Sequence, residues 1–308
     1  MDLVVSTDLK YYSKDSDQLV FLQNLTSKFP DFATHYPIGL DSHGNHMRVL
    51  EISNDLNKCQ EKPGLKFLGG LRSDPVSTEM LLFLADFILT HRNLDDEVGR
   101  VFQNYCLHFV FISSNNMWGS NENCNVSSPF LDEEFASSSS SPEARNLMAW
   151  MRKRNLFSHF ILWEILKIFI FLIQLLTTER LTAVSLSSYI NSLQSTSPTC
   201  TKIHQSNTLK VHTMSNMNWN ESLELGLGIS CCPYPEVTEL THIWSRHRRS
   251  LLSLISSGLQ GIHISIPQEG SSVQIQEISS NDFLVDNGNL WIALPEGLYT
   301  LSIDILDT

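Results

Sequence analysis

Apolar and polar positions alternate along the first half of the chain in a pattern that predicts strands separated by helices. Residues 65–89 show it most clearly, because an apolar run ends at Gly69 and Gly70 and apolar positions at helical spacing resume after Pro75. Asp74 stands where a helix N-cap is expected, and Pro75 suits the first helical position. We therefore predict a buried strand, a polar turn and an amphipathic helix, with any chemistry of this stretch in the turn.

The same two periodicities recur through most of the chain. They predict helices over residues 18–28, 95–104, 142–152 and 236–255, and buried strands over residues 47–52, 107–113 and 223–229. Strands separated by helices indicate an α/β fold in which helices cover both faces of a mixed central sheet. A small all-β domain is predicted at the end from short alternating segments at residues 261–266, 273–278, 290–294 and 298–303.

Residues 156–176 form the most apolar stretch and approach the length of a membrane span. Glu164 and Lys167 interrupt it, and a charge near the centre of a span costs about 2.5–3.5 kcal/mol. We favour a buried or interfacial helix over a membrane contact through this stretch. A third interpretation is that residues 153–213 are the product of aberrant splicing and do not belong to the folded domain.

The charge balance of the chain excludes one class of partner. A formal net charge of -12 argues against a nucleic-acid binder, since such a protein needs a basic surface that follows phosphates. Six cysteines are too few for a disulfide-built miniprotein, and they lack the C-x-x-C spacing of zinc ribbons. We therefore expect a globular domain without nucleic acid as a partner.

Three N-glycosylation sequons begin at Asn24, Asn125 and Asn220. They predict a glycoprotein of the secretory pathway, extracellular or lumenal. The amino terminus lacks a basic start followed by an apolar run. We therefore expect a mature chain, a fragment, or a domain of a longer chain that could be membrane-anchored.

Five segments together carry a family resemblance: YYSKDSDQLVFLQNLTSKFP, PIGLDSHGNHMRVLEIS, FLGG followed by PVSTEMLLFLADFIL, SPEARNLMAWM, and ISCCPYPEVTELTHIWSRHRRSLLSLI. They resemble the zinc metallocarboxypeptidases of the M14 family, in its carboxypeptidase N/E group, and most closely an enzymatically silent third repeat of a multi-repeat member. The resemblance implies a degenerate zinc-carboxypeptidase fold over residues 1–256, divergent at 153–213. It also implies a transthyretin-like β-sandwich over residues 257–308.

The resemblance also identifies where zinc chemistry would reside. In active relatives a His-x-x-Glu pair in the turn after the strand binds zinc, together with a later histidine. Here Leu71, or Arg72 if one residue is deleted, takes the histidine position, and Asp74 takes the glutamate position. Gly228 takes the position of the general-base glutamate. We therefore expect no catalytic residue, no metal ligand and no cofactor, although active relatives hold zinc.

No other group in the sequence rebuilds that site. The later histidine should fall within residues 157–170, but His159 stands alone there. An acidic segment at residues 130–135 takes the place of the family's carboxylate clamp, and a negative charge repels a carboxylate. His43 and His46 have a ligand-like spacing, but we interpret them as exposed residues of a turn.

The resemblance further implies two disulfide bridges, Cys124 with Cys232 and Cys200 with Cys231. Each would stabilise the fold by about 3–5 kcal/mol in the chain-entropy model. Cysteines kept beside lost catalytic groups suggest a fold retained for something other than hydrolysis.

Three functional hypotheses follow. The first is a catalytically inactive metallocarboxypeptidase-like domain that binds a peptide, a partner protein or neighbouring carboxypeptidase repeats. The second is an active zinc metallocarboxypeptidase that removes C-terminal basic residues with a rebuilt site. The third is an aberrant-splice product.

Overall fold

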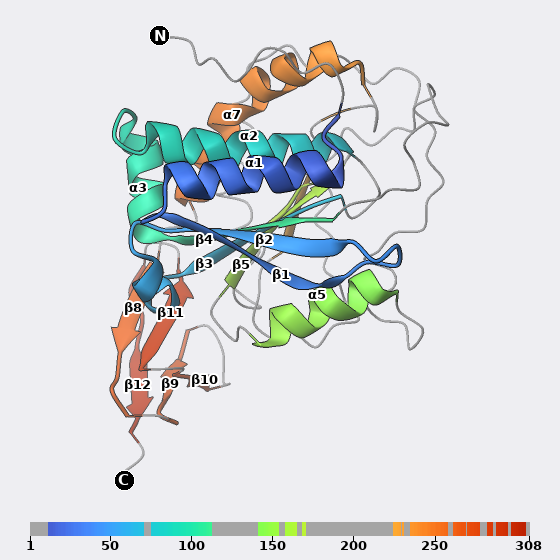
Figure 1. Cartoon of the computed structure of the whole chain (residues 1–308). Helices are drawn as coiled ribbons and strands as arrows, with labels where there is room; N and C mark the ends of the chain where they lie inside the picture. Colours follow the sequence, from blue (N-terminus) through green and yellow to red (C-terminus); the bar gives the residue numbers. More distant parts are fainter. Residues whose placement is uncertain are drawn as a thin grey trace, which may run out of the picture.

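The computed structural model describes residues 12–70, 75–112, 141–153, 158–164, 168–170, 224–228, 230, 235–257, 261–268, 270–277, 282–285, 288–294 and 297–305. A seven-stranded mixed sheet forms its centre, in the order β1-β2-β4-β3-β5-β6-β7 (Figure 1). The strands are β1 Ala33–Leu40, β2 His46–Ile52, β3 Gly64–Gly69, β4 Cys106–Phe111, β5 Ser158–Glu164, β6 Ile168–Ile170 and β7 Glu224–Gly228.

The middle of this sheet is parallel. Strand β3 runs parallel to β4 on one side and to β5 on the other, and β5 also pairs in parallel with β7. Strands β1 and β2 form an antiparallel hairpin that joins β4. The carboxyl ends of β3, β4, β5 and β7 therefore meet at one edge, where open α/β sheets hold their ligands.

Helices cover both faces of the sheet, as predicted. On one face lie α1 Asp15–Lys28, α2 Pro75–His91, α3 Asp96–Asn104 and α7 Leu240–Ser257, and on the other lies α5 Pro142–Lys153 (Figure 1). Two short 3-10 helices, η1 Leu56–Glu61 and η3 Val237–Glu239, complete this part. The first face holds the larger apolar core, and α5 packs with β2, β3 and β4 around a smaller one.

Helix α2 is more deeply buried than its sequence predicts. Thirteen of its seventeen residues are buried, so the predicted single apolar face was too narrow. The reason is α7, whose Trp244 packs edge-on against Phe83 at 6.0 Å and Phe87 at 5.7 Å between ring centroids. The helix is thus enclosed between the sheet and a second helical layer.

The helix predicted for residues 156–176 is wrong in the described part of that stretch, which forms β5 and β6. Strand β5 pairs with β3 from Gly64 opposite Ser158 to Gly69 opposite Trp163. A run of apolar residues fits a strand buried on both faces as well as a buried helix, and its aromatic and β-branched residues favour the strand. No helix among the described residues has the length and apolar character needed to cross a membrane.

The described residues from 261 onward form five short strands, in the part of the chain where a small all-β domain is predicted. Strands β9 Ser272–Ile275, β10 Phe283–Leu284 and β12 Leu301–Asp304 form one sheet, and β8 Gly261–Ser265 pairs with β11 Asn289–Ala293 in another. Both sheets contribute to one apolar core. The two-residue strand β10 escaped prediction because it is too short to show a period. The likeness to transthyretin and the domain boundary at residue 256 stay predictions.

The N-cap of α3 gives a direct test of the helix boundaries. The Asp95 carboxylate accepts hydrogen bonds from the backbone N–H groups of Glu97 at 2.9 Å and Val98 at 3.1 Å. Asp95→Ala should therefore lower the free energy of unfolding by about 1 kcal/mol, measured by urea denaturation. Asp95→Ser keeps a capping oxygen and should remain close to wild type; equal losses in both variants would contradict the assignment.

Candidate functional site

The carboxyl edge of β3 is built around two glycines. Gly70 has a φ of +84°, and a Cβ at this residue would lie 2.2 Å from the Ile112 carbonyl oxygen, so only glycine fits. Its N–H donates to Ser77 Oγ at 2.8 Å, which ties the end of β3 to the first turn of α2. The Ile112 N–H donates to the Gly69 carbonyl at 3.1 Å. The backbone at this edge is therefore held closely on both sides of the turn.

Glu79 of α2 lies near this edge and is buried. Its carboxylate accepts a hydrogen bond from the Ser13 backbone N–H, which attaches the segment before α1 to α2. Burial raises the pKa of Glu79 above its ordinary 4.5, against the opposing effect of the Ser13 hydrogen bond. Glu79 thus has a partner within the fold and serves the scaffold.

Most residues that the sequence predicts at the metal site fall outside the described part of the chain. These are Leu71, Arg72 and Asp74. Gly228 is described: it ends β7 and lies in register with Glu164 of β5 at the carboxyl edge. The residue that the resemblance assigns to the general-base position therefore lies where the parallel strands end.

His159 lies far from that edge along its strand. It pairs with Leu65 near the start of β3, whereas Trp163 pairs with Gly69 at the carboxyl end. Four residues at about 3.3 Å each separate the two positions by roughly 13 Å. The backbone register therefore places His159 too far along the strand for a metal bound at the carboxyl edge.

His43 and His46 are exposed, as predicted. They flank the β1–β2 turn, which Asp41 organises by accepting hydrogen bonds from the N–H of His43 at 2.9 Å and of Asn45 at 2.7 Å. Within the described residues neither histidine joins a group of three or more potential metal ligands. The interpretation of this pair as turn residues is confirmed.

A disulfide between Cys59 and Cys106 joins η1 to the start of β4. The bridge closes a separation of 47 residues and is buried, with 3% and 1% of the two residues exposed. A loop of this size corresponds to a stabilisation of about 4 kcal/mol in the chain-entropy model.

Sequence reasoning missed this bridge, although a signal was present. Once the resemblance assigns four of the six cysteines to pairs, Cys59 and Cys106 are the two that remain. The pairs assigned by resemblance involve Cys124, Cys200, Cys231 and Cys232, which all lie outside the described residues. Those two pairings stay predictions, as do glycosylation at Asn125 and Asn220; Asn24 is exposed on α1.

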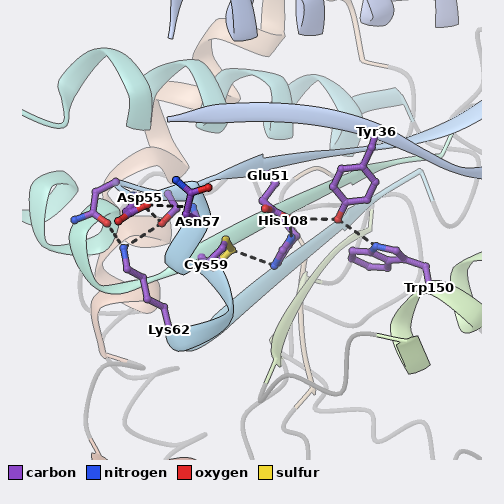
Figure 2. Close-up of a disulfide and its surroundings, with 11 residues drawn as sticks. Tyr36, Glu51, Asp55, Asn57, Cys59, Lys62, His108 and Trp150 are labelled. Carbon is purple, nitrogen blue, oxygen red and sulfur yellow. Dashed lines mark hydrogen bonds and ion pairs between the residues drawn. A yellow bond between two sulfur atoms is a disulfide. The ribbon is translucent and has the colours of Figure 1, made fainter. Parts of the chain in front are cut away.

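A buried row of ionisable side chains crosses the sheet beside the disulfide. Glu51 of β2 and Lys66 of β3 each pair with His108 of β4, which lies between them. The exposed fractions are 6%, 1% and 1% respectively. His108 Nδ1 lies 3.4 Å from Glu51 Oε2, and its Nε2 lies 3.3 Å from Cys106 Sγ (Figure 2). The imidazole is therefore held between a carboxylate and a sulfur atom.

Two aromatic side chains, Tyr36 of β1 and Trp150 of α5, pack next to this row of ionisable side chains. Tyr36 donates a hydrogen bond to Glu51 Oε2 at 3.4 Å and accepts one from Trp150 Nε1 at 3.3 Å (Figure 2). The ammonium of Lys66 lies 5.1 Å from the centre of the Trp150 ring. Ligand-type atoms of Glu51, Cys59, Cys106 and His108 lie within 4.8 Å of one another.

The sequence gives only a weak signal for this cluster. Cys106 and His108 are two apart in a strand and so share one face, but the other members come from different elements. Only the pairing of β2 with β4 and the packing of η1 bring them together.

Comparison with known proteins identifies relatives of this chain. Residues 19–115 match the family model described as zinc carboxypeptidase. Carboxypeptidase D of Mus musculus is 25% identical over 295 residues, which covers 84% of this chain and 21% of that protein. Carboxypeptidase D of Homo sapiens is 24% identical over 287 residues, with 82% and 21% covered. The chain therefore spans about a fifth of the length of these relatives.

Solved structures share the fold. The crystal structure of thrombin activatable fibrinolysis inhibitor (TAFI) superposes with a TM-score of 0.55 at 12% identity, covering 82% of this chain and 75% of that one. Bovine TAFI in complex with tick carboxypeptidase inhibitor gives 0.53 at 12% identity, with 80% and 97% covered. At this identity the comparison shows the mixed α/β fold of the zinc carboxypeptidases.

The raised pKa of Glu79 predicts a pH dependence of stability. A carboxyl group whose pKa is higher in the folded than in the unfolded protein favours folding while it is protonated. That contribution is lost as the pH rises from 4.5 through the folded pKa. In urea denaturation across this range, wild type should therefore lose stability relative to Glu79→Gln. The same change at the exposed Glu236 is the control; parallel curves for wild type and Glu79→Gln would contradict the prediction.

Proposed function

We propose that this chain is an M14 zinc-carboxypeptidase homologue that resembles carboxypeptidase D, and that it binds a peptide or protein without hydrolysing it. The observation that carries the proposal is Gly228 at the end of β7, which the resemblance assigns to the general-base position of the family. Glycine has no carboxylate to take a proton from water. In this proposal the position of the base keeps its backbone and has no side chain that could activate a nucleophile.

The residues at the family's zinc positions also fit a metal poorly. A catalytic zinc needs three nitrogen, sulfur or carboxylate ligands and one open position. Leu71 has no donor atom, the Arg72 guanidinium has no lone pair to donate, and Asp74 supplies a single carboxylate. We therefore assign no step of a zinc-dependent reaction to these residues.

The retained scaffold supports a binding role. The carboxyl edge is the place where the family binds its substrate. In this chain it keeps the constrained backbone of Gly69 and Gly70, and the hydrogen bond to Ser77 ties it to the buried helix α2. The acidic segment at residues 130–135 and the net charge of -12 favour a basic ligand over an acidic one. The ligand in this proposal is a peptide, a partner protein, or neighbouring carboxypeptidase repeats of a longer chain.

The proposed location is the secretory pathway, extracellular or lumenal. A buried disulfide between Cys59 and Cys106 is typical of proteins that fold in an oxidising compartment. The exposed Asn24 sequon fits glycosylation there. We also propose that the C-terminal sheets form a transthyretin-like domain, and that this chain corresponds to the third repeat of carboxypeptidase D.

The proposal is tested by incubating the protein with fluorescent peptides that end in Arg or Lys, in the presence of added zinc. We expect saturable binding measured by anisotropy and no released amino acid measured by mass spectrometry, with an active carboxypeptidase as positive control. Gly228→Glu should remain inactive, because a restored base still lacks metal ligands. Release of the C-terminal residue that a chelator stops, and that Asp74→Asn abolishes, would overturn the proposal.

A further inference from the structure

We propose that reduction of the Cys59–Cys106 disulfide creates a buried zinc site at the amino-terminal ends of β3 and β4. Its ligands are Cys59 Sγ, Cys106 Sγ and His108 Nε2, and Glu51 positions the imidazole. Cys106 pairs with Gly64, whereas Phe111, five residues on, pairs with Gly69 at the carboxyl edge. Five residues span about 17 Å, so this site is separate from the family's catalytic position.

The spacing of the donor atoms suits a tetrahedral metal. Zinc binds sulfur at about 2.3 Å and imidazole nitrogen at about 2.0–2.1 Å, which separates neighbouring ligands by roughly 3.5–3.8 Å. His108 Nε2 and Cys106 Sγ are 3.3 Å apart, and all the donors lie within 4.8 Å of one another. Once the sulfur–sulfur bond is broken, Cys59 Sγ and Cys106 Sγ need to move apart only to the distance that separates two neighbouring zinc ligands.

The second nitrogen of His108 is oriented for this role. Nδ1 faces Glu51 Oε2 at 3.4 Å, an ion-pair contact in which the structure records no hydrogen bond. The carboxylate favours a proton on Nδ1, which leaves the lone pair of Nε2 directed toward the sulfur atoms. A carboxylate behind a metal-binding histidine fixes the tautomer and the orientation of the ring. Tyr36 holds the same carboxylate oxygen from the other side.

The charges of the buried side chains cancel both in the disulfide form and in the zinc-bound form. In the disulfide form the Glu51 carboxylate is offset by the Lys66 ammonium in the same buried row. In the zinc form the two thiolates cancel the charge of the metal, and Lys66 again offsets Glu51. A buried site must avoid an uncompensated charge, because moving a lone ion out of water is costly. Because Lys66 offsets Glu51 in both cases, the same fold can hold either the disulfide or the zinc site.

The conversion needs a thiol or phosphine reductant. It supplies two electrons, and with two protons the sulfur–sulfur bond becomes two thiols while the reductant is oxidised. Zinc then binds both sulfurs as thiolates, and the two protons pass to solvent. The bridge is buried, so reduction requires η1 to open; this six-residue segment is held by the Asp55 cap and by hydrogen bonds from Lys62 to Ser53 and Asn54.

The test uses the full chain and cobalt as a spectroscopic substitute for zinc. Protein reduced with a phosphine under argon should bind one Co²⁺ per chain and show a thiolate-to-cobalt charge-transfer band with tetrahedral d–d bands. The oxidised protein should show neither. Zinc should displace the cobalt and remove the bands. Glu51→Gln should keep the stoichiometry and weaken the affinity by about 10–100-fold.

Matched variants assign the ligands. Cys106→Ser and Cys59→Ser should each lose the charge-transfer band, whereas a variant with Cys124, Cys200, Cys231 and Cys232 all changed to serine should keep it. His108→Gln leaves the disulfide intact, so its oxidised form should fold normally and its reduced form should lose tight cobalt binding.

Three results would overturn the proposal. They are a charge-transfer band that survives in Cys106→Ser, a band lost only in the fourfold serine variant, and reduced wild-type protein that unfolds and is not refolded by zinc. Far-ultraviolet circular dichroism of each reduced sample separates loss of ligands from loss of fold.

Discussion

Parallel pairing of β3 with β4 on one side and β5 on the other fixes which residues meet at each edge of the sheet. At the carboxyl edge this pairing brings Gly69 beside Phe111 and Trp163, and at the opposite edge it brings Gly64 beside Cys106 and Ser158. Because a strand is extended, the two edges are too far apart to share side chains. Every argument about chemistry in this fold therefore depends on this register.

The two edges of the sheet differ in the backbone features and side chains that they hold. The carboxyl edge keeps a tightly constrained backbone, where Gly70 leaves no room for a side chain against Ile112. It also includes Gly228 at the end of β7, which the resemblance assigns to the general-base position. The opposite edge holds a disulfide and the Glu51–His108–Lys66 row, sealed by Tyr36 and Trp150. Ionisable residues of the described sheet occur toward both edges, because Arg48 and Glu164 lie in register with the carboxyl ends of the parallel strands.

Sequence patterns predicted most of the scaffold because its signals are local. Asp95 and Pro142 mark helix starts, and the apolar spacing of residues 240–257 persists over several turns, so α3, α5 and α7 were predicted closely. The stretch at 158–170 was predicted wrongly because continuous apolar residues suit a buried strand as well as a helix. The Glu51–Cys59–Cys106–His108 cluster could not be predicted, because its members meet only through the pairing of β2 and β4 and the packing of η1.

The central proposal is that the position which the resemblance assigns to catalytic zinc does not hold zinc in this chain. Its most direct test is the metal content of the oxidised protein after equilibrium dialysis against zinc, measured by plasma mass spectrometry. With the Cys59–Cys106 bridge intact, the account predicts far less than one zinc per chain. One tightly bound zinc per chain, lost on substitution of Asp74, would contradict it.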